Sequence, residues 1–213
     1  ETAVNTIQFT QTRFTHSILN PPYKKINSNS RDRKLIRQAG IETVNLYSAF
    51  VGLSILLMAK GGLIVAIIPR SFCNGPYYRP FRELLLKVTA IRYIHLFYAR
   101  DKAFSDDKVL QENVIIMLEC GGKQGSVSIS TSTDDSFSDL LVSEYPFDRI
   151  VLPDDPEKFI RIPTTIQKTT LELSTIISHS LRDLGINVST GPIVDFRLKE
   201  FLLDMPSEGS VPL

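Results

Sequence analysis

The chain has 213 residues, of which 43% are hydrophobic and 22% are charged, and its formal net charge is +1 at pH 7. This composition is ordinary for a globular protein, and the balanced charge excludes a chain that binds nucleic acid through overall basicity. The 2 cysteines, Cys73 and Cys120, form neither a CxxC pair nor a disulfide framework, as in proteins of the reducing cytosol. We therefore expect a cytoplasmic protein that binds no metal, with its 3 separated histidines in structural roles.

No membrane anchor is expected. The longest apolar stretch, residues 49–59, is too short to span a bilayer, and no signal peptide is visible. The chain does not start with methionine, so we expect it to begin inside a longer polypeptide.

The first half of the chain predicts alternating strands and helices. A short apolar run should form a buried strand that stops at Pro21 and Pro22, because proline cannot donate to a strand ladder. A short helix, a long apolar helix, a central parallel strand and a further helix should follow. In chain order these elements cover residues 15–19, 32–39, 42–60, 63–68 and 76–88.

The second half predicts further strands and then a change of composition. Strands are expected over residues 91–98 and 113–118, with an edge strand over 126–131, so that a mostly parallel α/β sheet is finished by an antiparallel hairpin. The acidic, proline-rich stretch that follows predicts a surface connection. Beyond it, residues 165–184 predict an amphipathic helix that ends at Gly185.

The most informative motif is Asn20-Pro21-Pro22-Tyr23, which directly follows the first predicted strand. It resembles the signature of amino-group DNA methyltransferases of the N6-adenine type. The simpler interpretation is a strand-ending turn that buries a tyrosine. Since the exocyclic amine of adenine is a poor nucleophile, methyl transfer requires two hydrogen-bond acceptors that draw its nitrogen toward tetrahedral geometry.

The resemblance assigns a role to each residue of the motif. The side chain of Asn20 and the carbonyl group of Pro21 would accept from the target amine, and Pro22 would make the turn rigid. Tyr23 would stack on an adenine flipped out of the duplex. Phe104 matches the family's second base-stacking aromatic, although a simple loop anchor is the alternative.

The resemblance extends well beyond four residues. Further similar segments follow in the family's order, and they lie at residues 45–51, 61–72, 91–97, 113–118 and 188–197. Together they are similar to the restriction-modification methylases of the adenine type, with the last segment near the start of a target-recognition region. This resemblance implies a Rossmann-like methyltransferase fold, S-adenosylmethionine as the methyl donor and double-stranded DNA as the partner.

One element of the family pattern is absent. The family places its glycine-rich cofactor loop before the catalytic strand, but the 19 residues before Asn20 contain no glycine. The pairs Gly61-Gly62 and Gly121-Gly122 come too late in the chain to replace it. We therefore expect the main S-adenosylmethionine loop to lie upstream of this chain, which should be inactive alone.

A basic cluster directly follows the motif. It would contact DNA phosphates beside the flipped base, and a solvated loop is the alternative. The cluster consists of Lys24, Lys25, Arg31, Arg33, Lys34 and Arg37.

On these grounds we divide the chain into three parts. Residues 1–133 are expected to form the carboxyl-terminal half of a methyltransferase catalytic domain, 134–163 a connecting segment, and 164–213 the start of a target-recognition region. The expected function is adenine-N6 methylation of DNA in a restriction-modification system. A non-catalytic DNA-binding or assembly module, or a methyltransferase acting on protein glutamine, are the alternatives.

Overall fold

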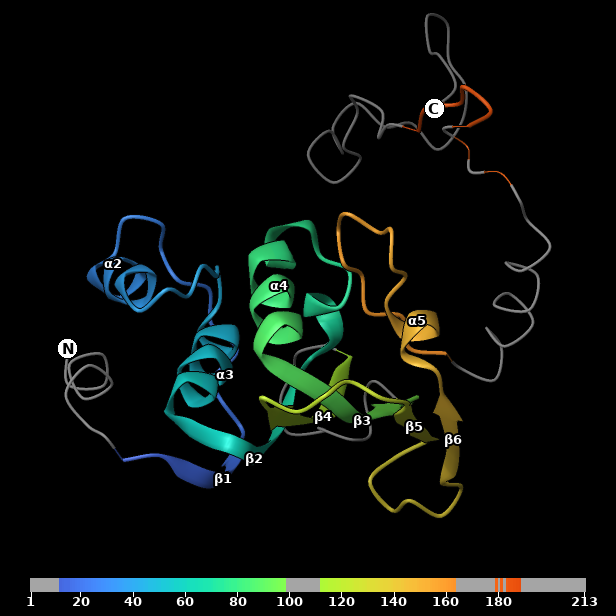
Figure 1. Ribbon diagram of the computed structural model, residues 1–213, viewed down its shortest axis with the longest axis horizontal. Coiled ribbons are helices and arrows are strands. Elements are labelled where there is room, and N and C mark those ends of the chain that lie inside the picture. The colour runs from blue at the N-terminus through green and yellow to red at the C-terminus, as the bar shows by residue number, and fades with distance from the viewer. Residues whose placement is uncertain (1–11, 99–111, 164–178, 180, 182, 189–213) are drawn as a thin grey trace, which may run out of the picture. The chain divides into compact units, whose positions relative to one another are not determined.

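The computed structural model describes residues 12–98, 112–163, 179, 181 and 183–188 (Figure 1). The chain divides into two compact units, Glu1–Lys168 and Thr169–Leu213. In the second unit, Gly185 is left-handed with φ +70°, and the amide of Ile186 donates to the carbonyl of Leu181 at 2.8 Å. This arrangement ends helices in many proteins, although most of the helix predicted over 165–184 lies outside the described residues.

The first unit is built on a six-stranded sheet with the strand order β1-β2-β4-β3-β5-β6. The α/β class predicted from the sequence is confirmed, and the sheet is mixed rather than mostly parallel. The β1–β2 and β3–β5 pairs are parallel, whereas β2–β4, β3–β4 and β5–β6 are antiparallel. The strands are β1 Phe14–Leu19, β2 Met58–Pro69, β3 Thr89–Phe97, β4 Asn113–Cys120, β5 Val127–Ser132 and β6 Leu141–Tyr145.

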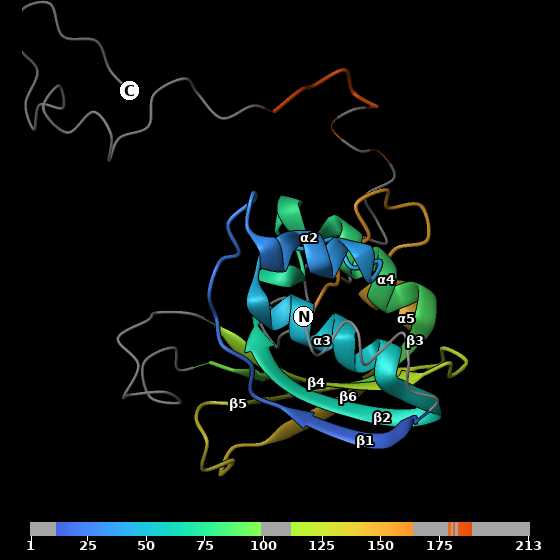
Figure 2. The ribbon, with the colours of Figure 1, turned by 90° about the vertical axis from the view of Figure 1, so that its left-hand side faces the viewer.

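Helices α2, α3 and α4 lie over the same face of this sheet (Figure 2). Apolar side chains of α3 and α4 pack there against alternate residues of the inner strands β2, β4 and β3, which forms the main core. In chain order the helices are α2 Arg31–Gln38, α3 Leu46–Leu57, α4 Arg79–Val88 and α5 Phe147–Ile150, with the 3-10 turns η1 Arg70–Phe72 and η2 Pro76–Tyr78 before α4.

The long helix predicted over residues 42–60 is shorter than expected. It begins after Asn45, which is extended with φ −133° and ψ 150°, and it ends at Leu57, because Met58 is extended and opens β2. Gly61 does not cap the helix. Gly61 has a φ of +79° and lies where the pairing of β2 with β1 shifts register, so this residue forms a bulge instead.

Strand β1 is correctly predicted as a strand, but it is not buried. It occupies one end of the sheet order, and Ile18 and Phe14 are 87% and 53% exposed. Its burial was expected from apolar character alone, which does not reveal how many neighbours a strand has.

The acidic stretch of residues 134–163 is part of the first unit rather than a surface connection. Strand β6 pairs with β5, which is therefore not the edge strand that its alternating pattern predicted. Ile150 and Ile160 are buried in the main core, and the amide of Ile160 donates to the carbonyl of Cys73 at 2.9 Å. The division into a methyltransferase part and a target-recognition part stays a prediction.

His95 on β3 is a structural residue, as predicted from its isolation in the sequence. It is buried, and its Nδ1 and Nε2 atoms lie 2.7 Å and 3.1 Å from the hydroxyl oxygens of Ser130 and Ser132 on β5. Its ring also packs against Phe97 and Phe137 at centroid distances of 4.4 Å and 5.2 Å. These contacts use both ring nitrogens within the sheet.

We expect His95 to make the stability of the chain pH-dependent. Burial lowers its pKa, so the unfolded state binds the proton more readily than the folded state. Its contribution is full above the unfolded pKa of about 6.5 and is lost as the pH falls through that value toward the lowered folded pKa. Urea unfolding at several pH values should show this fall, and His95→Gln should reduce it. An equal fall in His95→Gln and in the exposed control His16→Gln would contradict this assignment.

Candidate active site

The motif occupies the carboxyl end of β1, where the chain turns back over the end of β2. Leu19 is the last paired residue of β1, opposite Ala66, and Asn20 follows it as an exposed residue. Pro21 is buried beneath the turn, whereas Pro22 is exposed. The turn therefore presents the Asn20 carboxamide from a rigid base, because each proline fixes its own backbone φ angle.

Tyr23 anchors the far side of this turn. Its hydroxyl group donates to the carbonyl of Ile67 on β2 at 3.3 Å, and its half-buried ring meets the ring of Tyr47 edge-on, with centroids 6.2 Å apart and an interplanar angle of 86°. Contacts of this kind fix the orientation of the ring. Stacking of Tyr23 on a base stays a prediction.

A buried layer of aromatic side chains from α3 and η2 supports Tyr23. The rings of Tyr47 and Tyr78 are stacked with centroids 5.7 Å apart, and the Asn45 amide donates to the Tyr78 hydroxyl. The Tyr47 hydroxyl lies 3.2 Å from the hydroxyl of Ser71, and burial raises the pKa of Tyr47 far above its usual value, which keeps it neutral. Sequence reasoning assigned no role to these residues, although the family-like segment 45–51 contains two of them.

The loop after the motif is strapped to the segment that leads into α3. The amide of Leu46 donates to the carbonyl of Lys24 at 2.8 Å, and the amide of Ile26 donates to the carbonyl of Val44 at 2.9 Å. Lys25 also forms a β-bridge with Asn45. These backbone bonds hold the start of the basic cluster beside the motif.

The basic cluster divides into two groups in the structure. Arg33 is buried and pairs with Glu42, which also binds Arg37 at 2.6 Å. The hydrogen bond with Glu42 raises the pKa of Arg37, and the same bond is the main cause that lowers the pKa of Glu42. Arg33 and Arg37 therefore fasten α2 to the chain before α3, which weakens their assignment as phosphate contacts.

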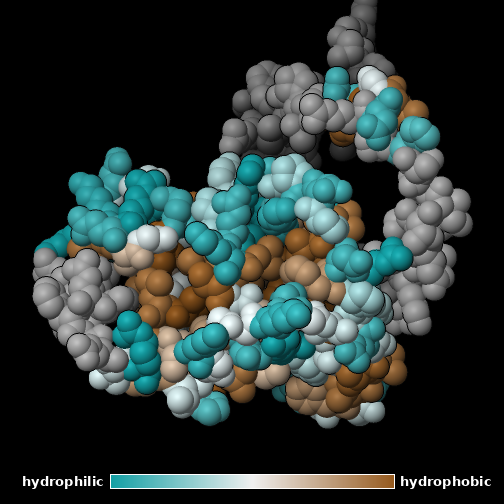
Figure 3. Space-filling view, in the orientation of Figure 1, coloured by the Kyte–Doolittle hydropathy of each residue, from teal (hydrophilic) through white to brown (hydrophobic). Residues whose placement is uncertain are grey.

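The other members of the cluster face solvent. Hydrophilic side chains cover the surface over α2 (Figure 3). Besides Arg37, which Glu42 binds, the exposed cations there and in the preceding loop are Lys24, Lys25, Arg31 and Lys34. They are the members of the cluster whose exposure fits contact with phosphates.

The two glycine pairs lie at the ends of the strands opposite to the end that carries the motif. Gly62 precedes Leu63, which pairs with Glu119 near the end of β4. Gly121 directly follows β4 and therefore lies at the same end of the strands as Gly62. Asn20 lies beyond the position of Ala66 at the other end of the strands, about 15 Å from Gly62 along the strand direction. A side chain at Gly62 would meet the carbonyl oxygens of Ala59 and Phe14 at 2.9 Å and 3.1 Å, so this glycine serves close backbone packing.

Several expected features cannot be placed. Phe104 and nearly all of segment 188–197 lie outside the described residues. Within the described part of the chain, no group of His, Cys, Asp and Glu side chains could hold a metal ion. Over the same residues, no helix is long and apolar enough to cross a membrane.

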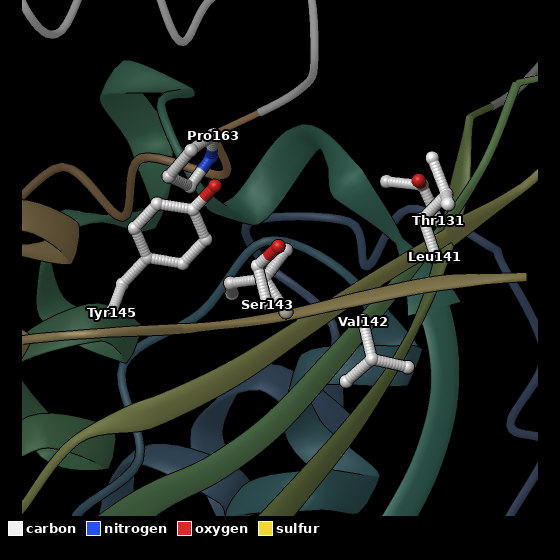
Figure 4. Close-up of a pocket in the computed structure, with 7 residues that line it drawn as sticks. Thr131, Leu141, Val142, Ser143, Tyr145 and Pro163 are labelled. Carbon is white, nitrogen blue, oxygen red and sulfur yellow. The ribbon is translucent and has the colours of Figure 1, made fainter.

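A cavity of about 220 Å³ lies on β5 and β6, at the opposite end of the strand order from β1. Figure 4 shows Ser143 and Tyr145 on one side of β6 and Val142 on the other. The lining is mainly apolar and hydroxylic, and it contains no carboxylate, histidine or cation. This cavity is therefore separate from the motif. Its lining residues are Ile129, Thr131, Leu141, Val142, Ser143, Tyr145 and Pro163.

Known proteins match this chain in sequence. Residues 2–104 match the Eco57I restriction-modification methylase family. The chain is 64% identical over 201 residues to the type II methyltransferase M.BsuBI of Bacillus subtilis and 45% identical over 203 residues to M.PstI of Providencia stuartii. Each match covers 94% of this chain, which spans 40% of the length of either relative. The predicted resemblance to the restriction-modification methylases is confirmed.

Solved structures show the same fold at low sequence identity. A modification subunit assigned to a type I restriction enzyme of Vibrio vulnificus has a TM-score of 0.53 at 10% identity, over 76% of this chain and 40% of its own. The type IIG restriction endonuclease BpuSI has a TM-score of 0.52 at 16% identity, over 63% of this chain and 19% of its own. The sheet therefore has the α/β methyltransferase fold.

Proposed function

We propose that this chain, similar to the restriction-modification methylases, carries the catalytic turn of a site-specific DNA adenine-N6 methyltransferase. The observation that carries the proposal is the position of Asn20 at the carboxyl end of β1, on a turn fixed by two prolines and by Tyr23. In open α/β sheets, ligands bind outside the carboxyl ends of the parallel strands. Sequence similarity to two type II methyltransferases supports the same reaction class.

The proposed chemistry depends on two acceptors rather than on a base. The Oδ1 atom of Asn20 and the carbonyl oxygen of Pro21 accept hydrogen bonds from the two amino hydrogens of a flipped adenine. This draws the nitrogen lone pair out of conjugation with the ring, so that it could displace S-adenosylhomocysteine from the methyl group of the donor. The sulfonium–methyl bond would break as the nitrogen–methyl bond forms, and the amine would release one proton to solvent. Tyr23, and Phe104 from the other side, would hold the base by stacking. The rigid turn supplies preorganisation, because little reorganisation is needed when the amine arrives.

The methyl donor in this proposal is S-adenosylmethionine, which supplies an electrophilic methyl group. Both glycine pairs lie at the ends of the strands away from Asn20, which supports the assignment of the main cofactor loop to sequence outside this chain. We therefore assign the cofactor loop to sequence upstream of this chain. A cytoplasmic location, where the cell's DNA is found, is part of the same proposal.

This division of labour can be tested with two proteins. Titration calorimetry with S-adenosylmethionine should show no tight binding to the chain alone, and binding to a polypeptide of the relatives' full length that contains it. Only the longer protein should transfer a tritiated methyl group to plasmid DNA. Tight cofactor binding by the chain alone would contradict the assignment of the loop, and no transfer by the longer protein would contradict the function.

The lysines beside the motif should set the salt dependence of DNA binding. Each phosphate contact that is lost lowers the slope of log K against log salt by about 1. We expect Lys24→Gln and Lys25→Gln each to weaken binding of the full-length protein and to lower this slope, as measured by fluorescence anisotropy at several salt concentrations. Arg37→Gln is the control, because Glu42 already binds Arg37. Equal slopes in all three variants would contradict the proposed contacts.

A further inference from the structure

A salt bridge joins the start of β4 to the turn after β2, at the same end of the strands at which β1 ends. Nη1 of Arg70 lies 2.9 Å from Oε2 of Glu112, and each side chain is 27% exposed. The backbones are joined as well, since the amide of Arg70 donates to the carbonyl of Glu112 at 2.7 Å. The neighbouring residues Pro69 and Asn113 pair in the ladder between β2 and β4. The two segments are thus connected by a salt bridge, by a backbone hydrogen bond and by the neighbouring ladder pair.

The same turn also supports the motif. Ser71, next to Arg70, lies 3.2 Å from the Tyr47 hydroxyl, and the Tyr47 ring meets that of Tyr23. A continuous series of contacts therefore runs from Glu112 to the motif. A displacement of the Arg70 turn would reach Tyr23 through this series.

A buried polar atom marks this edge as well. Asn113 is only 6% exposed, and its Oδ1 atom has no hydrogen-bond partner among the described residues. A buried acceptor of this kind is unfavourable unless another group donates to it.

We propose that Arg70 and Glu112 are positioning residues for methyl transfer. They hold the start of β4 and the turn after β2 at one fixed separation, and through Ser71 and Tyr47 this turn keeps Tyr23 in place at the motif. The inference rests on the proposed function and concerns the same site. Small displacements of positioning groups lower the rate of the chemical step more than they lower ground-state binding.

The chain contains a closely matched control for this pair. Arg92 and Glu119 form a second salt bridge to β4, at 2.8 Å, with side chains 27% and 29% exposed. It lies at the other end of β4, away from the motif. Loss of a salt bridge as such should affect both pairs alike, whereas loss of positioning should affect only Arg70.

The experiment compares Arg70→Met with Arg92→Met in the full-length protein. Sequencing of methylated plasmid DNA first locates the adenine that wild type methylates, and 2-aminopurine then replaces this adenine in a duplex substrate. The quantities measured are kcat, the KM for DNA and the fluorescence of the 2-aminopurine. We expect Arg70→Met to lower kcat by about 10- to 100-fold, with the KM for DNA changed by less than about twofold. The rise in fluorescence on base flipping should also be lost. Arg92→Met should stay within about twofold of wild type in each quantity.

A charge reversal separates positioning from folding. The double variant Arg70→Glu, Glu112→Arg can re-form the bridge and should recover most of the lost kcat, with a thermal unfolding midpoint close to that of wild type. Equal kcat values for Arg70→Met and Arg92→Met, or no recovery in the double variant, would overturn the inference while leaving the function intact. A wild-type protein that does not methylate DNA would overturn the function, and the inference with it.

Discussion

Replacing Asn20 by alanine in the full-length protein is expected to lower kcat for DNA methylation by about 10²- to 10³-fold or more. The variant loses one of the two acceptors that the proposed chemistry requires, and the Pro21 carbonyl cannot hold both amino hydrogens. Asn20 is exposed, so its truncation leaves the core of the sheet intact. Initial rates of tritiated methyl transfer at saturating DNA and S-adenosylmethionine measure the effect.

Asn29→Ala is the matched control for this variant. Asn29 is also an exposed asparagine, in the loop before α2, and its side chain has no part in the proposed chemistry. We expect its kcat to equal that of wild type, with the same circular dichroism spectrum for both variants. A near-normal rate in Asn20→Ala would remove the motif from the catalytic site.

Replacing Arg82 by methionine is expected to lower the free energy of unfolding of the chain by about 3–5 kcal/mol. Arg82 on α4 is fully buried, and its Nη1 atom donates to the carbonyls of Phe72 and Gly75 at 2.9 Å and 2.8 Å. Its Nε atom donates to the carbonyl of Glu157 at 2.9 Å, and Phe159 covers the guanidinium at 5.0 Å. Methionine fills much of the volume but leaves three carbonyl groups without their donor.

The urea unfolding midpoint, followed by circular dichroism, measures this loss. Arg79→Met is the control, because Arg79 lies on the same helix but is exposed and pairs with Glu83 and Glu157 at the surface. Surface pairs of this kind contribute little to stability, so we expect only a small shift of the midpoint. Equal shifts in both variants would show that Arg82 is not the link between the turn after β2 and residues 157–159.

The sequence predicted most of the sheet because its strands are bounded by clear signals. The run 63–68 ends at Pro69, and the strands at 91–98 and 113–118 are apolar runs of ordinary strand length. The junction at residues 57–58 was missed because apolar residues continue across it without a period that separates helix from strand. Strand β6 was missed because its Leu141–Tyr145 run is short and lies within an acidic, proline-rich stretch.

The site was predicted only as far as local motifs reach. Asn20 and Tyr23 could be assigned because their neighbours in the chain define the turn. The salt bridges of Arg33 and Arg37 with Glu42 could not be predicted, since Glu42 lies 9 and 5 positions away from them in a segment predicted to be helical. The Arg70–Glu112 pair spans 42 positions and depends on the antiparallel register of β2 and β4, which no local pattern reveals.

Mass spectrometry of nucleosides from DNA treated with the full-length protein and S-adenosylmethionine tests the central claim most directly. The two-acceptor chemistry assigned to Asn20 and Pro21 predicts methyl groups on the N6 nitrogen of adenine, formed by Asn20→Ala at a rate lower by about 10²- to 10³-fold or more. Methylation of cytosine carbon, or nucleosides that carry no added methyl group, would contradict the account.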